Sequence, residues 1–237
     1  LIAMSFNEFG HILASKEGGG LLLIYDSNSD KIPDRVRTYC DKVKNIQGIL
    51  ALNGEVFVTG DGPDGLALYR LSDKDRDGVL ENVRTLVRFK SEVAEHGPHG
   101  LVLGPDGLIY VMLGNHTSLE GEYDSGSPHR DYYDSDLVPK YEDPGGHAAG
   151  IKAPGGVVIR TDTEGSAVQL VAGGLRNPYD NPPLTNSDYD YWHWGPDEAL
   201  GTNPPGYASG KAYASTSVSN SLIDIENWFP GLMRSEE

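Results

Sequence analysis

The strongest constraint on the fold is a short hairpin pattern that the chain repeats. In each copy, apolar and polar residues alternate on both sides of a tight turn, which is typical of β-strands with one buried face. Each turn contains a glycine, and glycine adopts the positive φ angles that tight turns require. The copies lie at residues 6–15, 48–60 and 100–114, with turn glycines Gly10, Gly54 and Gly107.

A second, acidic pattern follows the first two hairpins. Residues 23–38 and 70–85 share the motif D-x-[N/D]-x-D-x-x-x-[D/E]-x-V-R-T at an offset of about 47 residues, and residues 158–171 form a weaker third copy. A period in the forties, built from short strands and glycine turns, is typical of β-propeller blades. Each blade is a four-stranded sheet that its neighbours cover. A β-sandwich with accidental internal similarity is the alternative.

We therefore predict an all-β fold, a β-propeller of the six-bladed type. A closed propeller of this type needs roughly 270 residues at about 45 residues per blade. The chain has 237 residues, and the repeat fades after Tyr179. We expect a fragment with about three to four blades over residues 1–180, followed by a divergent C-terminal segment at 181–237.

A long loop insertion is expected at 115–156, between the third hairpin and the next strand. Long segments without strands of their own are usually functional or disordered. The insertion is rich in tyrosine and acidic residues, which together suit a sugar or polyol surface. A solvated loop that packs over one end of the propeller is the alternative.

Composition excludes several classes of function. The formal net charge of −16 argues against nucleic-acid binding, which needs a basic surface. Cys40 is the only cysteine, so the chain has no internal disulfide and no cysteine metal cluster. No apolar run approaches the roughly 18 residues of a membrane-spanning helix.

Two copies of the acidic pattern have the ligand spacing of a calcium loop. Calcium prefers oxygen ligands, and alternating acidic residues supply several of them from one turn. Arg84 stands where a helix–loop–helix calcium site has glutamate, so this is not an EF-hand. A solvated turn is the alternative at both places. The candidate ligands are Asp73, Asp75, Asp77 and Glu81, with Gly78 at the turn, and Asp26, Asn28, Asp30 and Asp34.

Two short motifs suggest chemistry near the propeller axis. His96 and His99 lie in a turn that enters the third hairpin, and loops at the channel end of a propeller bind ligands. A histidine there can act as a general base, because its pKa lies near neutral pH. Downstream, Arg176 could bind an anionic ligand and Asn177 offers both a donor and an acceptor. The alternatives are a turn held by backbone hydrogen bonds and a surface salt bridge.

The two motifs, H-x-x-x-x-L-V-L-G-P-D-G-x-I-Y-V-x-x-G and G-L-R-N-P, resemble those of the soluble glucose/sorbosone dehydrogenase family. The chain is more similar still, over about residues 4–180, to bacterial membrane-bound dehydrogenase propellers that often accompany cytochrome c domains. The family's proteins are six-bladed propellers that oxidise aldoses with pyrroloquinoline quinone (PQQ) and calcium. The resemblance implies that His96 is the catalytic base and that Arg176 and Asn177 contact the quinone. His99 stands where the family usually has arginine, and we assign it to cofactor binding.

The resemblance thus implies a quinoprotein-type dehydrogenase that oxidises a sugar or alcohol hydroxyl with PQQ and calcium. It also implies a periplasmic or extracellular location and a cytochrome c domain as a partner. The alternative is a non-catalytic, calcium-stabilised propeller that binds a glycan or a protein. A fragment that does neither by itself is a third expectation.

Overall fold

The computed structural model describes residues 1–91, 96–129, 155–175 and 177–178, and within these ranges every regular element is a β-strand. The first sheet contains β1 (Met4–Phe6), β2 (Ile12–Ser15), β3 (Leu21–Tyr25) and β4 (Arg35–Cys40). The second contains β5 (Lys44–Leu52), β6 (Glu55–Gly62), β7 (Gly65–Ser72), β8 (Asn82–Lys90) and β11 (Ser118–Leu119). The third contains β9 (Pro98–Leu103), β10 (Ile109–Leu113), β12 (Gly156–Thr161) and β13 (Gln169–Leu175).

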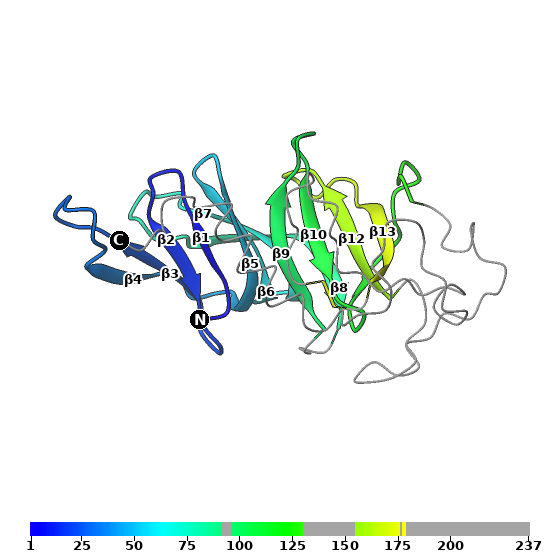
Figure 1. The fold of residues 1–237 in the computed structure, drawn as a ribbon, viewed down its shortest axis with the longest axis horizontal. Helices are drawn as coiled ribbons and strands as arrows, with labels where there is room; N and C mark the ends of the chain where they lie inside the picture. The colour runs from blue at the N-terminus through cyan, green and yellow to red at the C-terminus, as the bar shows by residue number, and fades with distance from the viewer. Residues whose placement is uncertain (92–95, 130–154, 176, 179–237) are drawn as a thin grey trace, which may run out of the picture.

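The predicted all-β class is confirmed. All strand pairs are antiparallel, and in each sheet four strands pair in the order in which the chain forms them. The three sheets follow one another along the molecule, from blue to yellow in Figure 1. Their first strands are neighbours, because β1 contacts β5 and β5 contacts β9. Within the described ranges, no helix is long and apolar enough to cross a membrane.

The three predicted hairpins are present, and their turn glycines have the expected conformation. Gly10, Gly54 and Gly107 have φ angles of 78°, 78° and 77°. These angles lie in the left-handed region, where a side chain on any other residue is strained. The turns join β1 to β2, β5 to β6 and β9 to β10.

The second sheet has a hydrophobic core on each of its faces. Val56 and Val58 of β6 belong to the core shared with the first sheet, whereas Phe57 between them belongs to the core shared with the third. Successive side chains of a strand point to opposite faces, so one strand can serve two cores. Tyr69 and Leu68 of β7 divide between the two cores in the same way.

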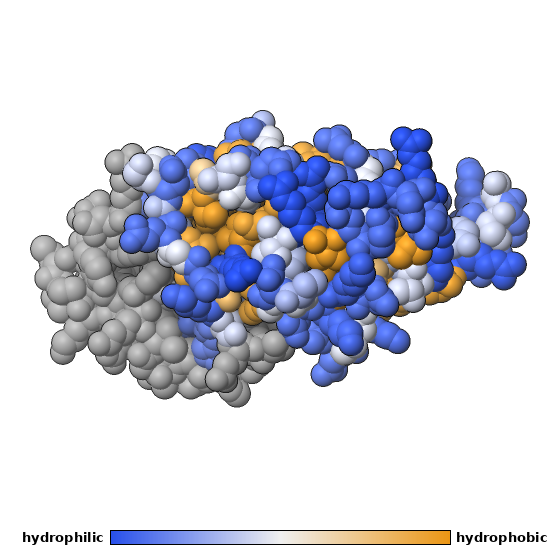
Figure 2. All heavy atoms as spheres, turned by 180° about the vertical axis from the view of Figure 1, so that it is seen from behind, coloured by the Kyte–Doolittle hydropathy of each residue, from blue (hydrophilic) through white to orange (hydrophobic). Residues whose placement is uncertain are grey.

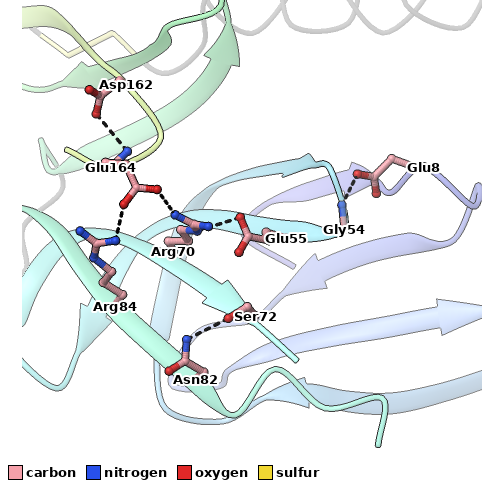
Figure 3. A network of polar contacts seen from close by, with 9 residues as sticks. All are labelled: Glu8, Gly54, Glu55, Arg70, Ser72, Asn82, Arg84, Asp162 and Glu164. Carbon is pink, nitrogen blue, oxygen red and sulfur yellow. Dashed lines mark hydrogen bonds and ion pairs between the residues drawn. The ribbon is translucent and has the colours of Figure 1, made fainter. Parts of the chain in front are cut away.

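The loop between the third and fourth strands of a sheet packs against the preceding sheet. In the second sheet, the Leu80 backbone N–H donates to the Tyr39 carbonyl at 2.7 Å. In the third sheet, Glu164 pairs with Arg70 and Arg84 of the second sheet, as Figure 3 shows. The acidic repeat of the sequence therefore forms contacts between sheets.

The predicted insertion begins with an ordered segment. Ser118 and Leu119 pair with Lys90 and Phe89 and add a fifth strand to the second sheet. Further on, the Asp124 backbone N–H donates to the Val168 carbonyl at 2.7 Å. Residues 130–154 of the insertion and residues 179–237 lie outside the described ranges.

Candidate functional site

The two predicted histidines lie at the edge of the third sheet where its strands begin or end. β9 and β12 begin at this edge, and β10 and β13 end there, because Pro98 pairs with Leu113 and Gly156 pairs with Leu175. Segments adjacent to these strand ends therefore meet. We call the group that they form the histidine edge; its members are His96, His99, Asn115, His116 and Asn177.

His96 is buried and is held by a carboxamide. Its side chain is 2% exposed, and its Nδ1 lies 2.5 Å from Oδ1 of Asn115. A carboxamide oxygen only accepts hydrogen bonds, so Nδ1 carries the proton and Nε2 is the accepting nitrogen of the ring. The His116 ring stacks on the His96 ring with 4.4 Å between centroids. When the ring is neutral, the contact with Asn115 thus fixes one tautomer of His96.

His99 is held in the opposite tautomer. It is also 2% exposed, and its Nε2 lies 2.8 Å from Oδ1 of Asn177. Burial disfavours the charged ring and lowers the pKa of His99 to about 4, against an ordinary value of 6.5; the hydrogen bond to Asn177 opposes this shift. The ring is therefore neutral at neutral pH.

Backbone contacts fix both histidines. The Thr59 hydroxyl donates to the His99 carbonyl at 2.8 Å, and the Thr117 hydroxyl donates to the His96 carbonyl at 3.2 Å. Gly114 leaves the space that the site needs, because a Cβ there would lie 2.5 Å from the His96 carbonyl oxygen and 2.6 Å from Asn177 Oδ1. The backbone carbonyls of both histidines are thus hydrogen-bonded, and the space beside Gly114 is filled.

The sequence analysis predicted His96, His99 and Asn177, and the structure brings all three to the histidine edge. Arg176 lies outside the described residues. Asn115 and His116 were not predicted. They follow the buried strand β10 after one glycine, and a polar pair at such a strand end indicates a candidate site residue. Thr59 lies within a strand of another sheet, so no local pattern could have pointed to it.

The calcium-loop spacing in the second sheet brings its four side chains together. Asp73, Asp75, Asp77 and Glu81 each have a carboxylate oxygen within 4.8 Å of the others. Oxygens that share one calcium ion lie within about 5 Å of each other, because calcium–oxygen distances are about 2.3–2.6 Å. No other group of three or more His, Cys, Asp or Glu side chains in the described ranges is so arranged. We call residues 73–81 the second-sheet acidic loop.

Backbone N–H groups donate hydrogen bonds to several carboxylate oxygens of this loop, but one buried oxygen has no partner. Asp73 accepts the backbone N–H of Gly78 at 2.8 Å, and Glu81 Oε1 accepts that of Lys74 at 3.1 Å. Glu81 Oε2 is buried and has no hydrogen-bond partner. An unpaired buried carboxylate oxygen is costly, so the oxygen set fits a hard cation such as calcium.

The equivalent loop of the first sheet, residues 26–34, has the same backbone hydrogen bonds within its turn. Asp26 accepts the backbone N–H of Lys31 at 2.6 Å, and Asp34 accepts that of Ser27 at 2.8 Å, as Asp73 and Glu81 do in the second-sheet loop. The side chain of Asn28 donates to Asp30 at 3.0 Å. The carboxylates of Asp26, Asp30 and Asp34 do not converge as those of the second-sheet loop do. We call residues 26–34 the first-sheet acidic loop.

An open groove of about 770 Å³ runs along β8 and β11. Its walls are mixed, with charged Arg84 and Glu120 beside apolar Leu119 and Val168. On the face of the molecule seen in Figure 2, hydrophobic surface likewise lies among hydrophilic side chains. The groove includes no residue of the histidine edge, so it is a separate feature.

Comparisons with known proteins identify a family. A family model described as "Domain of unknown function (DUF7133)" matches residues 7–138. No curated protein matches the chain. A crystal structure from Thermus thermophilus, described as a "putative oxidoreductase (glucose dehydrogenase)", is 19% identical with a TM-score of 0.40. The match covers 78% of this chain and 47% of that protein, so the chain spans about half of its length. A likeness this distant carries no argument about function.

Proposed function

This chain belongs to the DUF7133 family, and we propose that it forms part of a β-propeller dehydrogenase that oxidises a sugar or alcohol hydroxyl. The observation that carries the proposal is the 2.5 Å contact between His96 Nδ1 and Asn115 Oδ1. It leaves Nε2 as the nitrogen that accepts a proton. A neutral imidazole of fixed tautomer is what a general base requires.

The propeller part of the proposal is supported by the packing of the sheets. Each sheet is a meander in chain order, and the first strands β1, β5 and β9 lie next to one another. Sheets arranged in this way around their first strands form the blades of a propeller. The histidine edge lies where β9 begins, at the end of such an inner strand.

In the proposed reaction, oxidation removes a hydride from carbon and a proton from the hydroxyl. His96 Nε2 takes the proton, and Asn115 keeps the ring oriented while it does so. Asn177 and the neutral His99 supply hydrogen bonds to a hydroxylated or carbonyl ligand. General-base catalysis of this kind contributes about 10²–10⁴ in rate.

The fit to PQQ is only partial. When bound, PQQ would accept the hydride. Its carboxylates need cationic partners, whereas Asn115 and Asn177 are uncharged amides, and the low pKa of His99 keeps its ring neutral. The cationic residue nearest to Asn177 in the sequence is Arg176, which lies outside the described residues. The described residues therefore fit the proton transfer of the reaction. Binding of the quinone requires a separate test.

The acidic loop supports a second candidate function, a calcium-stabilised propeller that binds a glycan or a protein without catalysis. Asp73, Asp75, Asp77 and Glu81 would hold the ion. The first-sheet loop at Asp26, Asn28, Asp30 and Asp34 is a weaker proposal, because its carboxylates do not converge as those of the second-sheet loop do. A periplasmic or extracellular location and a cytochrome c partner belong to the dehydrogenase proposal.

A titration distinguishes the two functions. PQQ is added with and without calcium chloride while quinone absorbance and thermal stability are followed. Saturable, calcium-dependent binding that weakens in Arg176→Ala and not in Arg35→Ala, an exposed arginine of the first sheet, supports the dehydrogenase. Stabilisation by calcium without PQQ binding supports the binding propeller and contradicts the dehydrogenase.

A further inference from the structure

The first hairpin turn of the second sheet contains the only Asn-Gly pair of the sequence, Asn53-Gly54. Leu52 pairs with Glu55, so these two residues form the whole turn between β5 and β6. Both have positive φ angles, 54° for Asn53 and 78° for Gly54, and Asn-Gly is a preferred sequence for two-residue turns of this kind. Both residues are exposed. The turn is thus regular, and water reaches it.

An Asn-Gly pair can lose ammonia by an attack of the backbone on the side chain. The Gly54 nitrogen, after it has lost its proton to hydroxide, attacks Cγ of Asn53. A bond forms between that nitrogen and Cγ, the bond from Cγ to Nδ2 breaks, and ammonia leaves with a proton from water. Water then opens the cyclic imide at either of its two carbonyl carbons, which gives aspartate or isoaspartate. Glycine favours the attack because it has no side chain that restricts the backbone.

A carboxylate of the first sheet holds the nitrogen that would attack. The Gly54 backbone N–H donates to Oε1 of Glu8, in the turn between β1 and β2, at 2.8 Å, as Figure 3 shows. Because a peptide unit is planar, the electron pair of the deprotonated nitrogen would point where the N–H bond pointed, at Glu8 and not at Asn53 Cγ. A negative nitrogen beside a carboxylate is also disfavoured by like charge. Attack therefore requires Gly54 to separate from Glu8.

We propose that Asn53 is a site of spontaneous deamidation and that Glu8 sets its rate. The reaction is slow while Glu8 accepts the Gly54 N–H, and it proceeds when this contact opens. The product opposes the contact, because it adds a carboxylate near Glu8, and isoaspartate also lengthens the backbone of the turn by one carbon atom. Deamidation thus weakens a link between the first and second sheets irreversibly. The inference rests on this turn and goes beyond the proposed dehydrogenase function.

Mass spectrometry of the folded chain after incubation at mildly alkaline pH tests the proposal. Trypsin releases Asn53 in the peptide 45–70, and this peptide, incubated by itself, gives the unrestrained rate. We expect Asn53 to react about tenfold or more slowly in the wild type than in the peptide, because reaction requires local opening. Glu8→Ala should react at least about fivefold faster than the wild type, since it lacks the hydrogen bond. Glu17→Ala, which removes another exposed carboxylate of the first sheet, should keep the wild-type rate.

Urea unfolding of each variant checks that a faster reaction does not come from global unfolding. Equal rates in Glu8→Ala and the wild type would show that Glu8 does not control the reaction, and the proposal would be wrong. A wild type that reacts as fast as the peptide would also overturn it. So would a Glu8→Ala chain in which Asn53 stays intact while the peptide reacts. None of these results depends on PQQ, calcium or activity, so the outcome is independent of the proposed function.

Discussion

At the histidine edge, His96 and His99 are each 2% exposed and bonded to uncharged carboxamides, whereas the carboxylates of the second-sheet acidic loop are partly exposed and converge on one another. Burial is inexpensive for a neutral polar group that is hydrogen-bonded and expensive for a charge. The first region is therefore stable as it stands and is suited to proton transfer. The second gathers negative charge that a cation would neutralise.

The largest expected effect tests the neutrality of the histidine edge. Unfolded His99 binds a proton below its ordinary pKa of 6.5, but the folded residue does so only near pH 4. The unfolded state therefore binds more protons in this window, and the free energy of unfolding falls as pH falls from 6.5 to 4. The loss should be about 3 kcal/mol.

Urea unfolding at pH 7.5, 5.5 and 4.0 measures this loss. His99→Gln should be less stable than the wild type at pH 7.5 and lose less on acidification. The matched control is His11→Gln, in the first sheet, which should leave the wild-type pH dependence in place. If His99→Gln kept the full pH dependence, the low pKa of His99 could not be its source, and the two regions would not differ as described.

A slightly smaller effect tests the acidic loop. Calcium chloride at about 100 times its Kd should raise the free energy of unfolding by about 2.7 kcal/mol, because the ion binds only the folded state. Glu81→Gln should abolish most of this gain. Asp34→Asn, at the equivalent place in the first-sheet loop, should keep it. An equal loss in both variants would mean that the two loops bind calcium alike.

The smallest effect concerns the carboxamide that orients His96. Asn115→Leu removes the acceptor of His96 Nδ1 and should lower the free energy of unfolding by about 1–3 kcal/mol. Asn82→Leu, which removes a partly buried hydrogen bond to Ser72 Oγ of 2.8 Å, should cost about 1 kcal/mol or less. Urea midpoints compare the two. If the Asn115 change were the milder one, the orienting contact at His96 would not be important.

The sequence predicted the repeated elements well and their surroundings less well. Turn glycines and alternating strands are local signals, so the hairpins at Gly10, Gly54 and Gly107 were predictable. The convergence of Asp73 with Glu81 followed from spacing within one turn. By contrast, Thr59 contacts the His99 carbonyl from β6 of the second sheet, and no local pattern specifies a contact over 40 residues of chain. The two acidic loops share one pattern, but Asn28 stands where the second loop has Asp75, and only the second loop brings its carboxylates together.

The proposed catalytic role of His96 is tested most directly by the rate at which the complete polypeptide oxidises aldoses and alcohols when it is supplied with PQQ, calcium and a dye that accepts electrons. The account predicts that His96→Gln slows oxidation by about 10²-fold or more, that His11→Gln leaves the rate unchanged, and that PQQ binding survives in both. A His96→Gln variant that binds PQQ and oxidises substrate at the wild-type rate would contradict it.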